Sequence, residues 1–179
     1  MLAFPSTYTV GITSLGYQVV WATLAQRSDV DVRRLFTDQG DPPHGGGRGR
    51  GPTLDLFGLS LSWELDGPVL LELLEQQRIP LWARERGDRD PIVFGGGPVL
   101  TANPEPLAPF FDVVLLGDGE LLLPAFIDAV QAGRERQGEP AHQTVGDVAA
   151  ERLGHADGGH AHDDGGASST SELGTGAIL

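Results

Sequence analysis

Four short segments place glycine, serine, threonine or acidic residues directly after apolar stretches. They are Thr13-Ser14, Ser60-Leu61-Ser62, Gly95-Gly96-Gly97 and Gly117-Asp118-Gly119-Glu120. Because glycine has no Cβ atom, its backbone lets a ligand approach closely and tolerates a positive φ. The free N–H groups at the start of a helix attract anionic or carbonyl oxygens, and serine hydroxyls both donate and accept hydrogen bonds. These residues favour noncovalent binding of a small-molecule cofactor.

The composition offers no catalytic set and no metal site. The chain contains no cysteine, which excludes disulfides, thiol nucleophiles, zinc–thiolate sites and iron–sulfur ligation by its own residues. All twelve basic residues are arginine, so any mechanism that needs a lysine is excluded as well. The sequence shows no Ser–His–Asp arrangement and no carboxylate pair at a catalytic spacing. We therefore expect binding without catalysis.

Charge and hydropathy limit the partners. A net charge of -13 disfavours nucleic acid, whose recognition needs clustered positive charge. The longest apolar runs fall well short of the roughly 18 residues that a membrane span requires. The first residues lack the basic start and the apolar stretch of a signal peptide. We expect a cytoplasmic protein that binds neither nucleic acid nor membranes.

Five stretches predict the strands that would position the four segments. They are Tyr8–Thr13, Val30–Phe36, Leu56–Ser62, Ile92–Gly95 and Val113–Gly117. Short apolar runs are typical of parallel strands buried on both faces, and helical patterns begin at Ser14, Asp66 and Gly119. This alternation predicts a doubly wound α/β fold of the Rossmann-like or flavodoxin-like type: a five-stranded parallel sheet in the order 2-1-3-4-5 with helices on both faces. Since ligands bind at the carboxyl ends of such strands, the four segments would share one edge.

The sequence divides into two parts. Residues 1–136 carry the α/β pattern, whereas residues 137–179 contain few large apolar side chains. The run from Gly154 to Gly176 has no aromatic residue and a single leucine, so it cannot offset the entropy lost on ordering. We expect a domain over 1–136, a disordered acidic tail over 137–179, and a flexible surface loop at Gly45–Gly51.

Three segments taken together carry a family resemblance. FGLSLSWELD, GGGP followed by NPEPL, and GDGE resemble the N-terminal cobalamin-binding-type domain of radical S-adenosylmethionine (radical SAM) proteins. The resemblance extends from about Phe4 to Glu120. It implies that cobalamin would lie against Gly95–Gly97, Gly117–Glu120 and Ser60–Ser62. The Asp-x-His-x-x-Gly motif, whose histidine ligates cobalt in some such domains, is absent, because His44 follows Asp41 at the wrong spacing.

The same resemblance implies a catalytic barrel that these residues do not supply. In that family a Cys-x3-Cys-x2-Cys motif holds a [4Fe–4S] cluster that works with S-adenosylmethionine, and this chain has no cysteine. The chain is therefore expected to be a truncated accessory domain whose partner is a separate radical SAM catalytic domain. Two alternatives stay open: a stand-alone module that binds a flavin or a nucleotide, and an interaction domain without a ligand.

Overall fold

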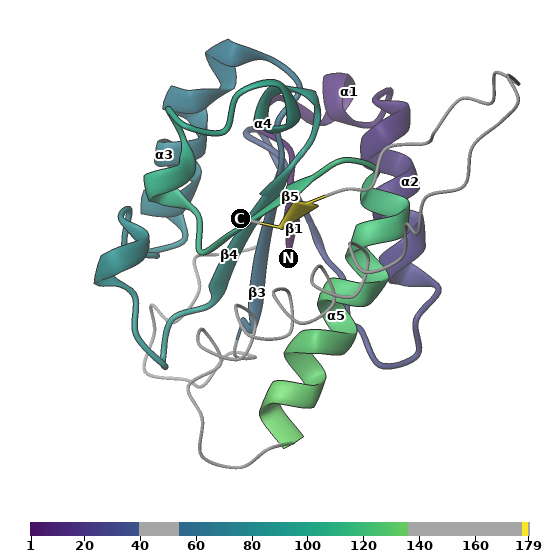
Figure 1. Cartoon of the computed structure of the whole chain (residues 1–179). Helices are drawn as coiled ribbons and strands as arrows, with labels where there is room; N and C mark the ends of the chain where they lie inside the picture. Colours follow the sequence, from purple (N-terminus) through teal and green to yellow (C-terminus); the bar gives the residue numbers. More distant parts are fainter. Residues whose placement is uncertain (40–53, 136–176, 179) are drawn as a thin grey trace, which may run out of the picture.

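A computed structural model of the chain describes residues 1–39, 54–135 and 177–178. Helices cover both faces of a central sheet (Figure 1). The expected loop at Gly45–Gly51 lies outside the described residues, and so does the expected tail apart from residues 177–178.

Five parallel strands form the sheet in the order β2-β1-β3-β4-β5. Their bounds are Leu2–Ala3 for β1, Arg34–Leu35 for β2, Leu56–Ser60 for β3, Ile92–Gly96 for β4 and Val113–Leu116 for β5. The predicted α/β class and the 2-1-3-4-5 order are confirmed. A further strand that the sequence did not predict, β6 (Ala177–Ile178), pairs antiparallel with β5.

The first predicted strand is wrong in its position. Residues Tyr8–Gly11 form the short helix α1, and the strand lies earlier, at Leu2–Ala3. The amides of Leu2 and Phe4 donate to the carbonyl oxygens of residues 33 and 35 at 2.7 and 2.9 Å, so this buried segment occupies the place beside β2. Tertiary pairing overrides the β-branched bias of Tyr8–Thr13 here. The second strand is also shorter than predicted, at Arg34–Leu35.

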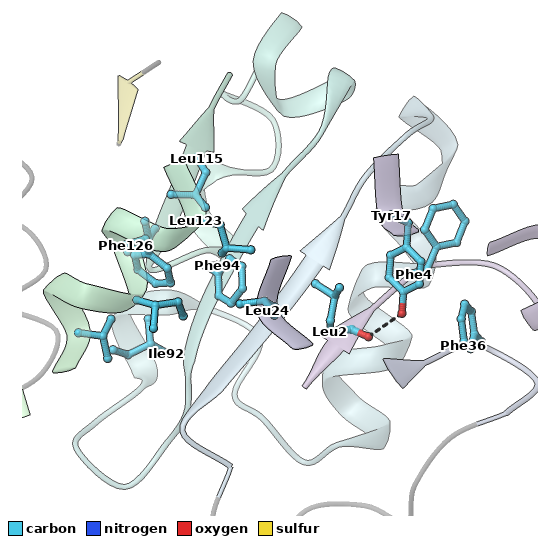
Figure 2. Close-up of a cluster of buried hydrophobic side chains, with 13 residues drawn as sticks. Leu2, Phe4, Tyr17, Leu24, Phe36, Ile92, Phe94, Leu115, Leu123 and Phe126 are labelled. Carbon is cyan, nitrogen blue, oxygen red and sulfur yellow. Dashed lines mark hydrogen bonds between the residues drawn. The ribbon is translucent and has the colours of Figure 1, made fainter. Parts of the chain in front are cut away.

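Two apolar clusters hold the helices against the sheet. Helices α2 (Leu15–Ala25) and α5 (Gly119–Glu135) cover one face, and α3 (Gly67–Gln76), α4 (Pro98–Ala102) and the 3₁₀ turn η3 (Ala108–Phe110) cover the other. In the first cluster the Tyr17 hydroxyl donates to the Leu2 carbonyl at 3.0 Å (Figure 2). Burial raises the pKa of Tyr17 above its ordinary value. This hydrogen bond connects α2 to β1. The order of the strands in the sheet changes direction between β1 and β3.

A surface network joins the end of α2 to α5 and gives a prediction for low pH. Arg27 donates to Asp29 at 3.0 and 2.8 Å and to Asp128 at 2.8 Å, and Gln131 donates to Asp29 at 2.8 Å. The hydrogen bonds from Arg27 and Gln131 hold the pKa of the Asp29 carboxyl well below its ordinary value of 3.8. A carboxyl whose pKa is lower in the folded state than in the unfolded state stabilises the fold at a pH above its unfolded-state pKa. This stabilisation is lost as the pH falls from the unfolded-state pKa towards the folded-state pKa.

Asp29→Asn is expected to reduce the loss of stability between about pH 6 and about pH 3, because the variant no longer has this carboxyl to protonate. The effect is small, since Asp29 is exposed and screened by solvent. Urea unfolding midpoints at the two pH values measure it. Asp88→Asn, which removes another exposed carboxylate remote from Arg27, serves as the control. An unchanged pH response in Asp29→Asn would contradict the role of the network.

Candidate functional site

The carboxyl ends of the strands form one continuous edge. We define the carboxyl edge as residues 4–17, 36–39, 60–68, 96–103 and 117–122, which follow the five parallel strands or contain their last residues. Ser60 is in register with Gly96, and Gly96 with Leu115. The Leu61 amide donates to the Gly96 carbonyl at 2.9 Å, which extends the pairing one residue beyond β3. The segments predicted after β3, β4 and β5 therefore lie side by side.

The glycines of this edge have different tasks. Gly97 has a φ of 111° and lies against the backbone of Leu61, so a Cβ atom there would overlap the Leu61 carbonyl oxygen. Gly117 has a φ of 124°, and its amide donates to the Thr101 hydroxyl at 3.3 Å. Both positions need glycine for the turn itself. At Gly96 a Cβ would find its nearest neighbour, the Leu115 carbonyl oxygen, 3.6 Å away, so this position has room.

Two other predicted site glycines serve packing. A Cβ at Gly95 would collide with the side chains of Phe111 and Leu100, which places this position in the core. A Cβ at Gly119 would lie 3.0 Å from Val20 of α2, so Gly119 lets α5 approach α2 closely. Of the five predicted site glycines, those at positions 96, 97 and 117 therefore remain as candidates for contact with a ligand.

The segment after β3 is organised by one carboxylate. Asp66 accepts hydrogen bonds from the amides of Ser62 and Trp63 at 3.1 and 3.0 Å and fixes the 3₁₀ turn η1 (Glu64–Asp66). The predicted start of a helix at Asp66 is confirmed, since Asp66 is the N-cap residue of α3. Its side chain makes no capping hydrogen bond to α3 and bonds backward into the loop. Ser60 and Ser62 are half-buried, whereas the Leu61 side chain is fully buried and offers only its backbone to a ligand.

Thr13 and Ser14 follow the helix α1 and do not directly follow a strand. The Thr13 hydroxyl donates to the Val10 carbonyl at 2.8 Å, and the Ser14 hydroxyl accepts from the Tyr17 amide at 3.5 Å as the cap of α2. Both hydroxyls therefore have local structural tasks. The residues that follow β1 directly are 4–7, and the sequence interpretation missed them because it placed the strand at Tyr8–Thr13.

At β5 the chain enters α5 through Asp118. Its carbonyl oxygen accepts from the amides of Leu121 and Leu122 at 3.0 and 3.1 Å, which starts the helix. The side chains of Asp118 and Glu120 are exposed. The first amides of the helix have no acceptor within the helix and lie at the carboxyl edge.

All the charged residues of the carboxyl edge are acidic. They are Asp38, Glu64, Asp66, Asp118 and Glu120. The described arginines lie elsewhere: at the ends of α2, α3 and α5, in and just before β2, and in the segment that leads into β4. A surface with charge of one sign repels ligands of the same sign. The described residues of the edge therefore disfavour phosphate-rich ligands and suit a neutral or cationic one.

The described part of the chain contains no group of three or more histidine, aspartate or glutamate side chains placed to hold a metal ion. All five histidines lie outside that part. Within the same described residues, no helix has the length and apolar character to cross a membrane.

Residues 51–152 match the family model for the N-terminal region of radical SAM proteins. The chain belongs to this family. The matched region begins before β3 and passes through α5, so it contains the edge segments after β3, β4 and β5. Neither curated proteins nor solved structures gave a match. The radical SAM family uses S-adenosylmethionine and an iron–sulfur cluster in its catalytic domain, and this chain has no cysteine to ligate such a cluster.

Proposed function

We propose that the chain is an accessory domain of a radical SAM protein and binds cobalamin at its carboxyl edge. The observation that carries the proposal is the register of Ser60, Gly96 and Leu115, which gives an edge of close-lying backbone where Gly96 has no side chain and its space is not filled by a neighbouring side chain. Ligands of open α/β sheets bind at this end of the strands. Catalysis belongs to a region with the Cys-x3-Cys-x2-Cys motif, which residues 1–179 do not contain.

The chemistry of the edge fits cobalamin better than a flavin nucleotide. Cobalamin presents a broad ring fringed with amides, which donate hydrogen bonds to carboxylates such as Asp118 and Glu120. FMN carries a terminal phosphate with up to two negative charges, whereas cobalamin carries one phosphodiester charge. The described residues of the carboxyl edge offer such a phosphate no arginine. When bound, cobalamin supplies a redox-active cobalt that exchanges methyl groups. The described residues of this chain would hold and orient the ring, with no histidine from the Asp-x-His-x-x-Gly motif.

Titration of the purified full chain with hydroxocobalamin, FMN and S-adenosylmethionine tests the proposal. We expect a visible absorbance change with hydroxocobalamin and a dissociation constant well below about 1 mM, which corresponds to roughly -4 kcal/mol. Preferential binding of FMN would favour the stand-alone flavin module. If none of the three ligands binds below about 1 mM, the edge is not a site for them and the ligand-free alternative gains support.

Gly96→Val is expected to weaken hydroxocobalamin binding by about tenfold or more, because its side chain would hold the ligand away from the backbone at the end of β4. The fold should persist, since the nearest atoms, both of Leu115, lie 3.6 and 3.8 Å from the added Cβ. Gly87→Val makes the same change in open space at the opposite end of the sheet and is the matched control. Unchanged affinity in Gly96→Val would place the ligand elsewhere.

A further inference from the structure

The sheet has an open edge at β2. This strand ends the strand order, and among the described residues no strand lies beyond it, whereas β6 pairs with β5 at the other side. The Leu2 amide donates to the carbonyl oxygen of Arg33, so residue 33 directs its backbone groups towards β1. Because successive residues of a strand direct these groups to opposite sides, Val32 and Arg34 direct theirs outward. An edge strand of this kind can pair with another chain.

The open edge extends before β2 along residues 30–33, which form neither helix nor turn. Val30 and Val32 are half-buried and pack against the first apolar cluster, while Asp31 and Arg33 are exposed. This alternation is that of a strand. Within the part of the chain that the structure describes, the backbone of residues 30–32 makes no hydrogen bond. A second strand laid along this edge would therefore satisfy backbone groups that β1 does not reach.

The charges of this edge complement those of a second copy that runs antiparallel to it. Asp31 and Arg33 have side-chain exposed fractions of 82 and 47 %, and their charged groups lie 3.5 Å apart. If Val32 pairs with Val32 of the second copy, Asp31 lies directly opposite Arg33 of that copy, and the same pair repeats across the two-fold axis. Since Val32 directs its backbone outward, the two Val32 residues can exchange both of their hydrogen bonds in this register.

The order of the charges decides whether such an edge repels or attracts its copy. Charged side chains on an edge strand usually prevent pairing. With Asp31 and Arg33 two positions apart, opposite charges instead face each other directly, which stabilises an antiparallel pair. The net charge of -13 makes two copies repel each other at low ionic strength. At about 0.15 M salt the screening length is about 8 Å, so the pairs in contact outweigh the distant charges.

We propose that two copies of this chain form a dimer through the outer edge of β2, antiparallel and centred on Val32, with Asp31 of each copy opposite Arg33 of the other. The two parallel sheets would then join into one continuous sheet. Because the copies run antiparallel, their carboxyl edges lie at opposite ends of that sheet and stay open. The dimer is therefore independent of what the carboxyl edge binds.

Sedimentation velocity of the full chain at about 0.15 M salt tests the proposal. We expect a monomer–dimer equilibrium with a dissociation constant of about 100 µM or lower. Asp31→Arg and Arg33→Asp each place equal charges opposite each other, so each should weaken the dimer by about tenfold or more. Asp88→Arg and Arg89→Asp make the same changes at exposed positions in the segment before β4 and should leave the dimer unchanged.

A mixture of the two single variants tests the register itself. An Asp31→Arg copy opposite an Arg33→Asp copy has an arginine facing an aspartate at both places, so a heterodimer should form with at least the wild-type affinity. The double variant Asp31→Arg/Arg33→Asp should regain the homodimer for the same reason. Far-UV circular dichroism and urea unfolding establish that each variant is folded.

Three results would overturn the proposal. The first is a wild-type chain that stays monomeric up to about 500 µM. The second is a dimer that both single variants leave unchanged, because that dimer would use another surface. The third is loss of the dimer in the folded single variants without recovery in the mixture or in the double variant, because residues 31 and 33 would then not face each other.

Discussion

Arg86→Met is expected to lower the free energy of unfolding by about 3–5 kcal/mol, because it removes the positive charge that balances a buried carboxylate. The Arg86 side chain is fully buried, and its Nη1 donates to Asp112 Oδ2 at 2.9 Å. The same carboxylate oxygen accepts from the Val93 amide at 2.7 Å. Three further N–H groups of the guanidinium donate to the carbonyl oxygens of Pro80, Leu81 and Phe110, at 2.9, 2.8 and 2.8 Å.

Urea unfolding at neutral pH measures this loss. Arg89→Met removes the same charge from an exposed position nearby and should change stability by less than about 0.5 kcal/mol. A loss below about 1 kcal/mol in Arg86→Met would mean that the ion pair is not needed to join the segment before β4 to the start of β5. Because the pair lies at the end of the sheet opposite the carboxyl edge, any folded fraction of the variant should still bind ligand normally.

Gly97→Ala is the second substitution with a large expected effect. Backbone strain at a φ of 111° contributes on the order of 1–3 kcal/mol for a residue with a Cβ. Overlap of that Cβ with the Leu61 carbonyl forces the ends of β3 and β4 apart and adds a loss on the order of 1–3 kcal/mol. We therefore expect a total loss of about 3 kcal/mol, together with weaker ligand binding in the molecules that remain folded.

Gly96→Ala provides the matched control for this prediction, since its added methyl meets only ordinary contacts at 3.6 Å or more. Its stability should stay within about 1 kcal/mol of the wild type. Urea unfolding of the two variants gives the comparison directly. Equal stability of the two variants would contradict the close approach of Gly97 to Leu61.

The order of the sheet could be predicted because three of its strands are clear in the sequence. Leu56–Ser60, Ile92–Gly96 and Val113–Leu116 are short apolar runs separated by helical patterns, and such runs indicate parallel strands buried on both faces. The strand at Leu2–Ala3 could not be predicted, because two residues are too few to show a periodicity. β6 has the same brevity.

The candidate site was only partly accessible from the sequence. The rule that ligands bind at carboxyl strand ends predicts that Ser60 and Gly96 share an edge, and the register places them together. Whether a glycine is surrounded by core side chains or lies at the edge depends on its neighbours in the fold. The sequence therefore could not show that Gly95 belongs to the core while Gly96 lies at the edge. In the same way, the exposed Leu121 lies in an apolar run next to buried Leu123, and the composition of the run does not distinguish them.

The ion pair of Arg86 and Asp112 shows the same limit for charged residues. Twenty-six positions separate the two partners, and the sequence around Arg86 is rich in charges that suggest a solvated loop. Only the turn at residues 80–86 and the approach of η3 bring backbone carbonyls around the guanidinium. The burial of a charged side chain depends on contacts between segments far apart in the sequence, and local sequence patterns do not predict such contacts.

The placement of the three tryptophans gives the chain its own optical probes. Trp63 is at the carboxyl edge, and Trp82 packs against Phe110 at the opposite end in a tilted arrangement. The Cζ atom of Arg34 lies 4.4 Å from the centroid of the Trp21 ring. Emission from Trp63 therefore reports on the edge, while Trp82 and Trp21 act as internal references. Since the charges around Trp63 are acidic, a cationic quencher such as caesium reaches its indole more readily than iodide does.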